Sequence, residues 1–232
     1  MMPDMDRRFG LREMVIAGAA LAASCTYSGS VDNPVLRKAT WFSYVGGEDI
    51  RRDCRPGDLA RYRLVYNAIW DEQVRAYDLL QSATGEGALL FATVFKGGGL
   101  DIVQALSPGA GRWGGERADR RLDEATYRDL VAAIERSGLN APSPDGLRLY
   151  SFSFFWVAMG CVDGRFHFNA WDHPADRFNR IAFAQPLFAL DNTGVPVNPA
   201  RPINLAERRG WAYAGSHEKT NFELMVGVNG LR

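Results

Sequence analysis

The chain is poor in cysteine and histidine and carries no excess of either charge. Its 232 residues include three Cys and three His, and 27 basic residues balance 27 acidic ones. Three cysteines are too few for a disulfide framework that replaces a core, and a net charge of zero argues against a nucleic-acid partner or a polybasic membrane patch. Hydrophobic residues make up 47% of the chain, which excludes intrinsic disorder. We therefore expect one globular domain with a buried core.

The chain also lacks a long hydrophobic run near its N-terminus. Residues 14–24 (MVIAGAALAAS) are apolar and uncharged. Eleven helical residues extend only about 16 Å, roughly half of a bilayer's hydrocarbon core. A basic head (Arg7, Arg8 and Arg12) precedes the run, and small residues lead to Cys25, an arrangement typical of a cleaved export signal. The expected organisation is an export signal at residues 1–24, a polar tether at 25–33 and a single globular domain at 34–232.

The end of this apolar run resembles the lipobox of bacterial lipoproteins. The matching residues are Leu21–Cys25 (LAASC), with Ala22 where the family usually has Leu. The resemblance implies that Cys25 is acylated, becomes the new N-terminus and holds a periplasm-facing protein to the membrane. Thr26, in place of the Asp that marks inner-membrane retention, implies the outer membrane. Residues 6–12 (DRRFGLR) resemble a twin-arginine signal, so either export route remains open. The alternative is a cytosolic protein with an amphipathic first helix, although no polar face recurs within residues 14–24 at helical spacing.

Hydrophobic periodicity in the rest of the chain predicts an α+β fold, an antiparallel sheet with helices packed on one face. Asp123 is a good N-cap for a helix that ends at Gly138, and residues 162–165 (VDGR) are typical of a hairpin turn. The expected strands are 60–70, 74–80, 88–95, 147–161, 166–171 and 222–228. The expected helices are 33–46, 123–138 and a third from Asp172 to Pro186. The expected irregular segments are a charged turn at 48–58, a glycine-rich loop at 96–117 and an extended stretch at 191–204.

Residues 146–190 resemble a strand, hairpin, strand and helix pattern of uncharacterised bacterial exported proteins. This resemblance implies a shape and no activity.

Two cysteines remain if Cys25 is acylated. In an oxidising compartment an even pair is more often bonded than free, so we expect a disulfide between Cys54 and Cys161. The alternative is that both are buried, unpaired thiols.

The candidates for chemistry are few. The chain has no Gly-x-Ser-x-Gly motif, and His217-Glu218 lacks the second His of a zinc-protease helix. His167, Asp172 and His173 are the only cluster that suggests a zinc site or a general base. Both histidines also have local structural roles available, His173 at a helix start and His167 across a hairpin. We therefore expect them to serve structure, with no metal and no cofactor.

Trp113 and three arginines are candidates for binding. Trp113 lies in the glycine-rich loop, where it is the best-placed tryptophan for stacking on a glycan; the alternative is a core position. Arg61, Arg63 and Arg75 suggest either an anion site or a solvated face paired with carboxylates, and the second interpretation is favoured.

These observations predict a non-catalytic envelope lipoprotein, a binding or assembly module held to the membrane through Cys25. Its expected partner is an envelope protein or a cell-wall component. One alternative is an envelope hydrolase that uses the His167 region, and another is an accessory subunit of a membrane complex. Convergent polar groups around His167 would favour the hydrolase, whereas an exposed apolar patch would favour assembly.

Overall fold

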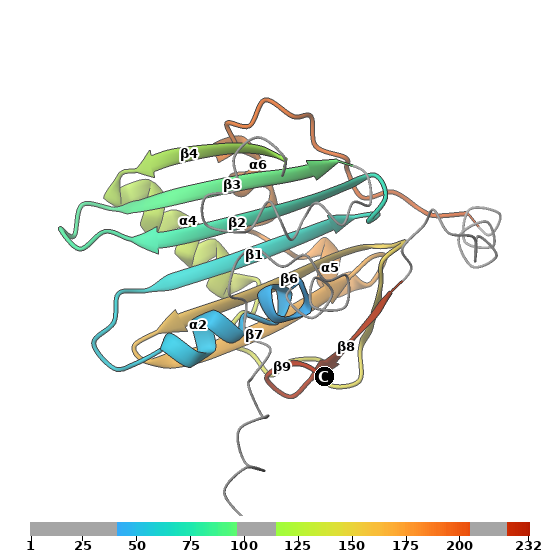
Figure 1. Ribbon diagram of the computed structural model, residues 1–232, viewed down its shortest axis with the longest axis horizontal. Coiled ribbons are helices and arrows are strands. Elements are labelled where there is room, and N and C mark those ends of the chain that lie inside the picture. The colour runs from blue at the N-terminus through green and yellow to red at the C-terminus, as the bar shows by residue number, and fades with distance from the viewer. Residues whose placement is uncertain (1–40, 97–114, 205–221) are drawn as a thin grey trace, which may run out of the picture.

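The computed structural model describes residues 41–96, 115–204 and 222–232 and has an α+β fold, as the sequence predicts (Figure 1). The predicted export signal, Cys25, Trp113 and His217 lie outside these residues. The strands are β1 (Arg61–Ala68), β2 (Gln73–Gln81), β3 (Ala88–Lys96), β4 (Glu116–Leu122), β5 (Arg148–Tyr150), β6 (Phe154–Val162), β7 (Arg165–Asp172), β8 (Glu223–Gly227) and β9 (Gly230–Leu231). The helices are α2 (Glu48–Asp53), α4 (Glu124–Arg136), α5 (Asp176–Asn179) and α6 (Ala184–Leu190).

Six strands form one antiparallel sheet in the order β4-β3-β2-β1-β6-β7. In the centre of this sheet, Tyr66 of β1 lies opposite Arg75 of β2 and Trp156 of β6. The turn between β6 and β7 is Asp163-Gly164, with φ angles of 50° and 71°. Two successive positive φ angles suit a tight hairpin, because the turn then follows the twist of the strands. This is the hairpin that the sequence predicts.

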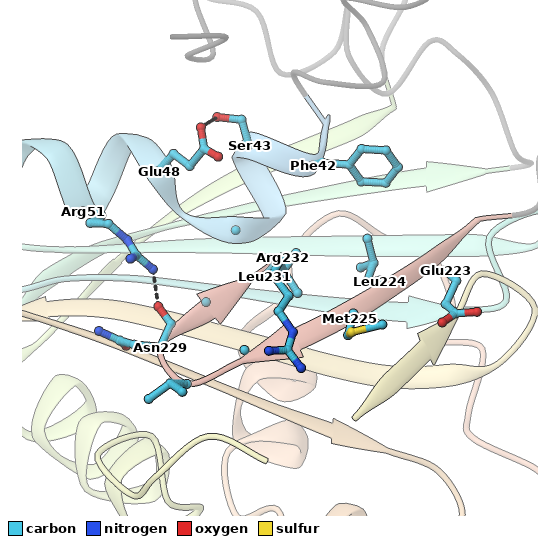
Figure 2. Close-up of a pocket in the computed structure, with 14 residues that line it drawn as sticks. Phe42, Ser43, Glu48, Arg51, Glu223, Leu224, Met225, Asn229, Leu231 and Arg232 are labelled. Carbon is cyan, nitrogen blue, oxygen red and sulfur yellow. Dashed lines mark hydrogen bonds between the residues drawn. The ribbon is translucent and has the colours of Figure 1, made fainter. Parts of the chain in front are cut away.

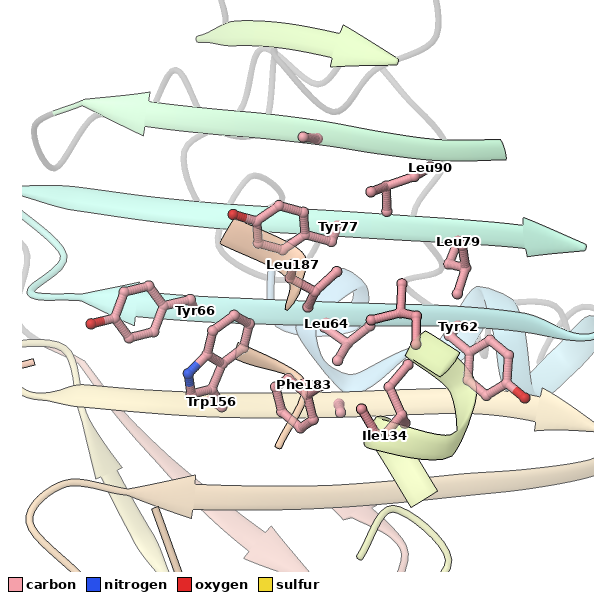
Figure 3. Packing of buried hydrophobic residues seen from close by; sticks show 14 of the residues in the cluster. Tyr62, Leu64, Tyr66, Tyr77, Leu79, Leu90, Ile134, Trp156, Phe183 and Leu187 are labelled. Atoms are coloured by element: carbon pink, nitrogen blue, oxygen red, sulfur yellow. The ribbon is translucent and has the colours of Figure 1, made fainter. Parts of the chain in front are cut away.

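Helices α4, α5 and α6 pack on one face of the sheet (Figure 3). Asp123 begins α4 as predicted, because its carboxylate accepts a hydrogen bond of 2.7 Å from the Thr126 backbone N–H. Between the helices and the sheet, the Phe183 ring meets the Trp156 ring edge-on at 5.1 Å. Such aromatic contacts add to the free energy of simple burial. The core of this face is therefore well ordered, and it includes Leu187 of α6.

The opposite face of the sheet is covered as well. Residues 41–46, which are helical, lie there with α2 and a small sheet in the order β5-β8-β9. In Figure 1, α2 and β8 are seen in front of the large sheet and α4 behind it. Trp41, Ile50 and Leu224 are buried against Val157 of β6. The central strands are thus buried on both sides, which explains why the apolar run in β6 does not alternate with polar residues.

The prediction of a charged turn at residues 48–58 is wrong for its first half, which forms α2. Ile50 is only 2% exposed and holds the helix to the sheet. Gly47 precedes the helix with a φ angle of 69°, and a Cβ at this residue would lie 2.7 Å from the Met159 Sδ atom. Glycine therefore allows the chain to turn closely over β6.

The predicted strand at 147–161 is two strands that belong to different sheets. β5 joins β8, and β6 joins β1 and β7. Between them, the carbonyl of Ser151 accepts a hydrogen bond of 2.8 Å from the Trp70 N–H, so residues 151–153 turn across the end of β1. Hydrophobicity alone does not reveal this break, because both strands are apolar.

The predicted role of Pro186 as a helix stop is also wrong. Residues 172–175 are not helical, α5 is short, and Pro186 lies in the first turn of α6. A proline is tolerated there because the first backbone N–H groups of a helix have no partner within it.

Candidate functional site

A groove of about 890 Å³ lies between residues 41–53 and the β8–β9 hairpin (Figure 2). We call it the hairpin groove. Its apolar lining comes from both sides, with Phe42 on the helical side and Leu224, Met225 and Leu231 on the hairpin. Val228, at the tip of the hairpin, is 77% exposed. A largely apolar concave surface of this size is an expected place for a ligand or a polypeptide segment.

The charged side chains around the hairpin groove are each paired. Two of these pairs are ion pairs, whereas Glu48 and Arg51 are hydrogen-bonded to neutral oxygen atoms. The pairs are Glu48 with the Ser43 hydroxyl (2.6 Å), Arg51 with the Asn229 carbonyl oxygen, Glu223 with Arg148 (2.8 Å) and Arg232 with Asp145 (3.4 Å). The Arg51 guanidinium also lies 4.4 Å from the centre of the Phe166 ring.

One backbone edge in the hairpin groove has no strand beside it among the described residues. In the β8–β9 hairpin, Val226 lies opposite Leu231, and the Arg232 N–H donates to the Met225 carbonyl at 2.9 Å. Backbone groups of alternate residues in an antiparallel pair point to opposite sides, so those of Leu231 point away from β8. No hydrogen bond joins them to another backbone group in the described ranges. The hairpin groove therefore combines apolar side chains with an open backbone edge.

A buried ionic network fixes α2 as one wall of the hairpin groove. The Arg63 guanidinium is 3% exposed and binds Asp49 of α2 at 2.8 and 2.9 Å and Asp78 of β2 at 2.9 Å. Tyr44 donates from its hydroxyl to Asp78 and offers its carbonyl to Arg63. Burial acts to raise the pKa of Asp49, but Arg63 and Arg61 outweigh it and hold that pKa below its ordinary value.

A disulfide fixes the other end of α2. It joins Cys54, the residue after the helix, to Cys161 of β6, and the two Cα atoms lie 5.5 Å apart. This is the pairing that the sequence predicts. α2 is therefore held to the sheet at one side by Arg63 and at its C-terminus by Cys161.

The third arginine, Arg75, belongs to the opposite face. It is fully buried and binds Asp191 at 2.5 Å and the carbonyl oxygens of Val195 and Pro196. Asp191 also accepts from the Tyr77 hydroxyl at 2.8 Å. The expectation of a solvated arginine face is therefore wrong for Arg63 and Arg75, while their pairing with aspartates is correct. Both arginines hold segments of the fold in place.

The structure separates His167 from Asp172 and His173, the other two residues that suggested catalysis. His167 and Asp172 lie five residues apart on β7, so their side chains point to opposite faces, about 16 Å apart along the strand. His173 packs edge-on between Phe154, at 6.0 Å, and Phe178, at 5.2 Å. Burial lowers the pKa of His173, and the Asp172 carboxylate opposes this effect. Within the described ranges, no three His, Cys, Asp or Glu side chains gather to hold a metal ion.

Comparisons with protein families, with curated proteins and with solved structures found nothing that matches this chain. In the part of the chain that the structure describes, no helix has the length and apolarity needed to cross a bilayer.

Sequence reasoning missed the hairpin groove. The sequence predicts a turn for the α2 part of its helical wall and a single final strand for its hairpin, whereas residues 41–46 of the wall lie within the predicted helix 33–46. Two signals point to it in retrospect. Ile50 stands alone among charged residues, as the buried side of a short helix does, and Asn229-Gly230 is a turn signal between two apolar residues.

Proposed function

We propose that this protein is an envelope lipoprotein whose folded domain is a non-catalytic binding module. Its ligand is an extended, apolar segment of a partner envelope protein, bound in the hairpin groove. The observation that carries this proposal is the open backbone edge at Leu231, which among the described residues has no strand beside it, next to the apolar lining of that groove. An added strand satisfies such an edge through main-chain hydrogen bonds and places alternate side chains on the lining.

The chemistry of the groove favours a polypeptide over a small anion or a sugar. Glu223 and Arg232 are paired with the opposite charges of Arg148 and Asp145, so a bound anion would gain little from Arg232 or Arg148. The lining of the groove holds Phe42, Met225 and Leu231, which favour apolar side chains. An uncharged peptide segment satisfies both conditions.

The location of the binding module follows from the sequence. The apolar run before Cys25 and the resemblance to a lipobox support acyl anchoring of the mature chain, which faces the periplasm and is held at the outer membrane. A tethered module with a peptide-binding groove suits a role in assembling or holding an envelope complex.

Site-specific photo-crosslinking tests this proposal. A photoreactive amino acid replaces Met225 in one full-length chain and Glu135, which is exposed on α4, in another. Irradiation of intact cells is expected to give a discrete protein adduct only for the Met225 chain. The crosslinked residues of the partner are expected to fall within one short apolar segment.

A second variant tests whether the adduct depends on the lining of the hairpin groove. Leu231→Lys places a charge on the groove lining and is expected to reduce the Met225 adduct at least fivefold while the thermal midpoint changes little, because Leu231 is partly exposed. Equal adducts at Met225 and Glu135, or an adduct that Leu231→Lys leaves unchanged, would overturn the proposal.

A further inference from the structure

The edge strand β4 has a backbone edge that no other described segment pairs with. It pairs only with β3, with Ala118 opposite Ala92. Of its residues, Glu116, Arg117, Asp119, Arg120 and Arg121 are exposed, and Ala118 is intermediate. Backbone groups on the outer side of an edge strand lack strand partners, so such a strand is a template for another strand unless its side chains prevent pairing.

The charges of β4 restrict what can pair with it. Two copies of this chain can extend their sheets into one only if the β4 strands run antiparallel about a two-fold axis. In such a pair, directly opposed residues point their side chains to the same face of the joined sheet. The two-fold axis therefore passes beside one residue of β4, and that residue lies opposite its own copy. A charged residue at that place would face an identical charge at a separation of about 5 Å.

Only one position of β4 that is not buried avoids this repulsion. The sequence of β4 is ERADRRL, in which every residue is charged except Ala118 and Leu122. Leu122 is buried against α4 and is 2% exposed. The axis can therefore pass only beside Ala118.

The register set by Ala118 brings unlike charges together. Arg117 of each copy lies opposite Asp119 of the other, and Glu116 lies opposite Arg120. The two-fold axis repeats both pairs, so each of the four contacts joins opposite charges. A register centred on Asp119 instead places Asp119 against itself and Arg117 against Arg121. A strand that carried one sign of charge would repel its copy in every register. In β4, a register centred on a charged residue places that residue beside its own copy, whereas the register centred on Ala118 joins unlike charges alone.

We infer that the chain forms a two-fold dimer through β4, in which the two six-stranded sheets become one continuous antiparallel sheet centred on Ala118. In Figure 1, β4 and the β8–β9 hairpin lie at opposite ends of the molecule, so each hairpin groove remains open in the dimer. The inference stands on β4 alone and does not depend on the proposed function.

Cysteine crosslinking tests the register. In the inferred dimer the Cα atoms of Ala118 and its copy lie about 4.5 to 5.5 Å apart, a separation that a disulfide spans. Full-length Ala118→Cys is expressed and oxidised in intact cells with a membrane-permeant oxidant, and a band of twice the monomer mass is expected on non-reducing gels. Arg121→Cys is the matched control, because it lies about 20 Å from its own copy in this register. The parent chain, which has no added cysteine, measures how much crosslinked dimer forms through its own cysteines.

Charge exchange tests the contacts. Arg117→Asp, combined with Ala118→Cys, places a carboxylate opposite Asp119 at both symmetric contacts and is expected to reduce the crosslinked fraction roughly tenfold. Adding Asp119→Arg exchanges the two charges and is expected to restore the crosslink. Both side chains are exposed, so neither change is expected to unfold the domain. The inference is overturned if Arg121→Cys crosslinks as well as Ala118→Cys, if no dimer forms, or if the exchange fails to restore it.

Discussion

At the scale of single residues, the most consequential side chains are two buried arginines. Arg63 and Arg75 are 3% and 0% exposed, and each has carboxylate or carbonyl partners for its guanidinium nitrogens. Burying a cation is costly unless its partners replace the lost water, and both sites meet that condition. Each arginine joins the sheet to a separate segment, Arg63 to α2 and Arg75 to residues 191–196.

Removing the Arg63 charge is expected to destabilise the domain strongly. Arg63→Met keeps an apolar side chain but leaves Asp49 and Asp78 without their shared cation, which should lower the free energy of unfolding by about 3 to 5 kcal/mol. Arg61, which also binds Asp49, is 35% exposed, so Arg61→Met should cost about 1 kcal/mol or less. Urea unfolding followed by circular dichroism measures both. Similar losses of unfolding free energy for Arg63→Met and Arg61→Met would contradict the conclusion that the buried ion pairs contribute more than the exposed one.

The same network makes stability sensitive to acid. The pKa of Asp49 in the folded state lies below its ordinary value of 3.8, as does that of Asp191. A carboxylate with a lowered pKa stabilises the fold fully above that ordinary value and loses its contribution as the pH falls through the folded-state pKa. The free energy of unfolding is therefore expected to decrease below about pH 4. Asp49→Asn should be less stable than the parent at pH 7, and its free energy of unfolding should decrease less between pH 4 and pH 2. The same decrease in both proteins would contradict a stabilising role of the Asp49 carboxylate.

At the scale of elements, α2 shows how a short helix is held by its surroundings. A helix of six residues is not stable alone, because nucleation is costly and few hydrogen bonds repay it. Ile50, the Asp49–Arg63 ion pair and Cys54 supply the missing stability through contacts with the sheet. This dependence matters for function because α2 is a wall of the hairpin groove.

The disulfide is expected to dominate the attachment of α2. It closes a loop of 107 residues, for which the chain-entropy model gives about 4 to 5 kcal/mol of stabilisation as an upper value. The double variant Cys54→Ser with Cys161→Ser should unfold at a clearly lower urea concentration than the oxidised parent.

Thiol counting provides the independent check. Denatured protein that has not been reduced should show no reactive thiol at these two positions, and two after reduction. Two free thiols before reduction would mean that the pair is unbonded in the cell.

At the scale of the whole molecule, the two surfaces that we propose bind partners lie at opposite ends of the domain. The hairpin groove has an apolar lining and an open backbone edge, and β4 has a charged edge whose register at Ala118 joins unlike charges. A tether at the N-terminal side of the domain would hold both surfaces close to a membrane, where confinement raises the effective concentration of partners.

The anchor itself gives a direct prediction. Protein extracted from membranes is expected to begin at Cys25 and to carry the mass of acyl chains, as intact-mass spectrometry would show. Cys25→Ser should shift the protein to the soluble fraction, because the net charge of zero provides no electrostatic attachment to anionic lipids. A chain that retains Met1 and lacks acyl mass would exclude the lipoprotein interpretation.

The sequence by itself determined the parts of this protein that depend on neighbouring residues. Alternation predicted β1, the turn at residues 84–87 between two runs predicted β2 and β3, Asp123 predicted the start of α4, and Asp163-Gly164 predicted the hairpin between β6 and β7. These signals are local, because a cap, a tight turn and a period of two act over only a few residues. The pairing of Cys54 with Cys161 also followed from the sequence, through the expectation that Cys25 is acylated and leaves two cysteines to pair.

Only the tertiary structure decided which surfaces are buried and which remain open. The sequence alone suggests that Arg63 and Arg75 lie on the surface. In the folded chain, Asp49, Asp78 and Asp191 from distant segments form ion pairs with them, so both arginines are buried. His167, Asp172 and His173 suggested a cluster, but strand geometry places the side chain of His167 on the face opposite that of Asp172. The hairpin groove forms where α2 and residues 41–46 lie beside the β8–β9 hairpin, which is distant from them in the sequence. The edge of β4 is open because no other described strand pairs with it. Burial and strand pairing depend on those distant contacts, and local sequence patterns do not specify them.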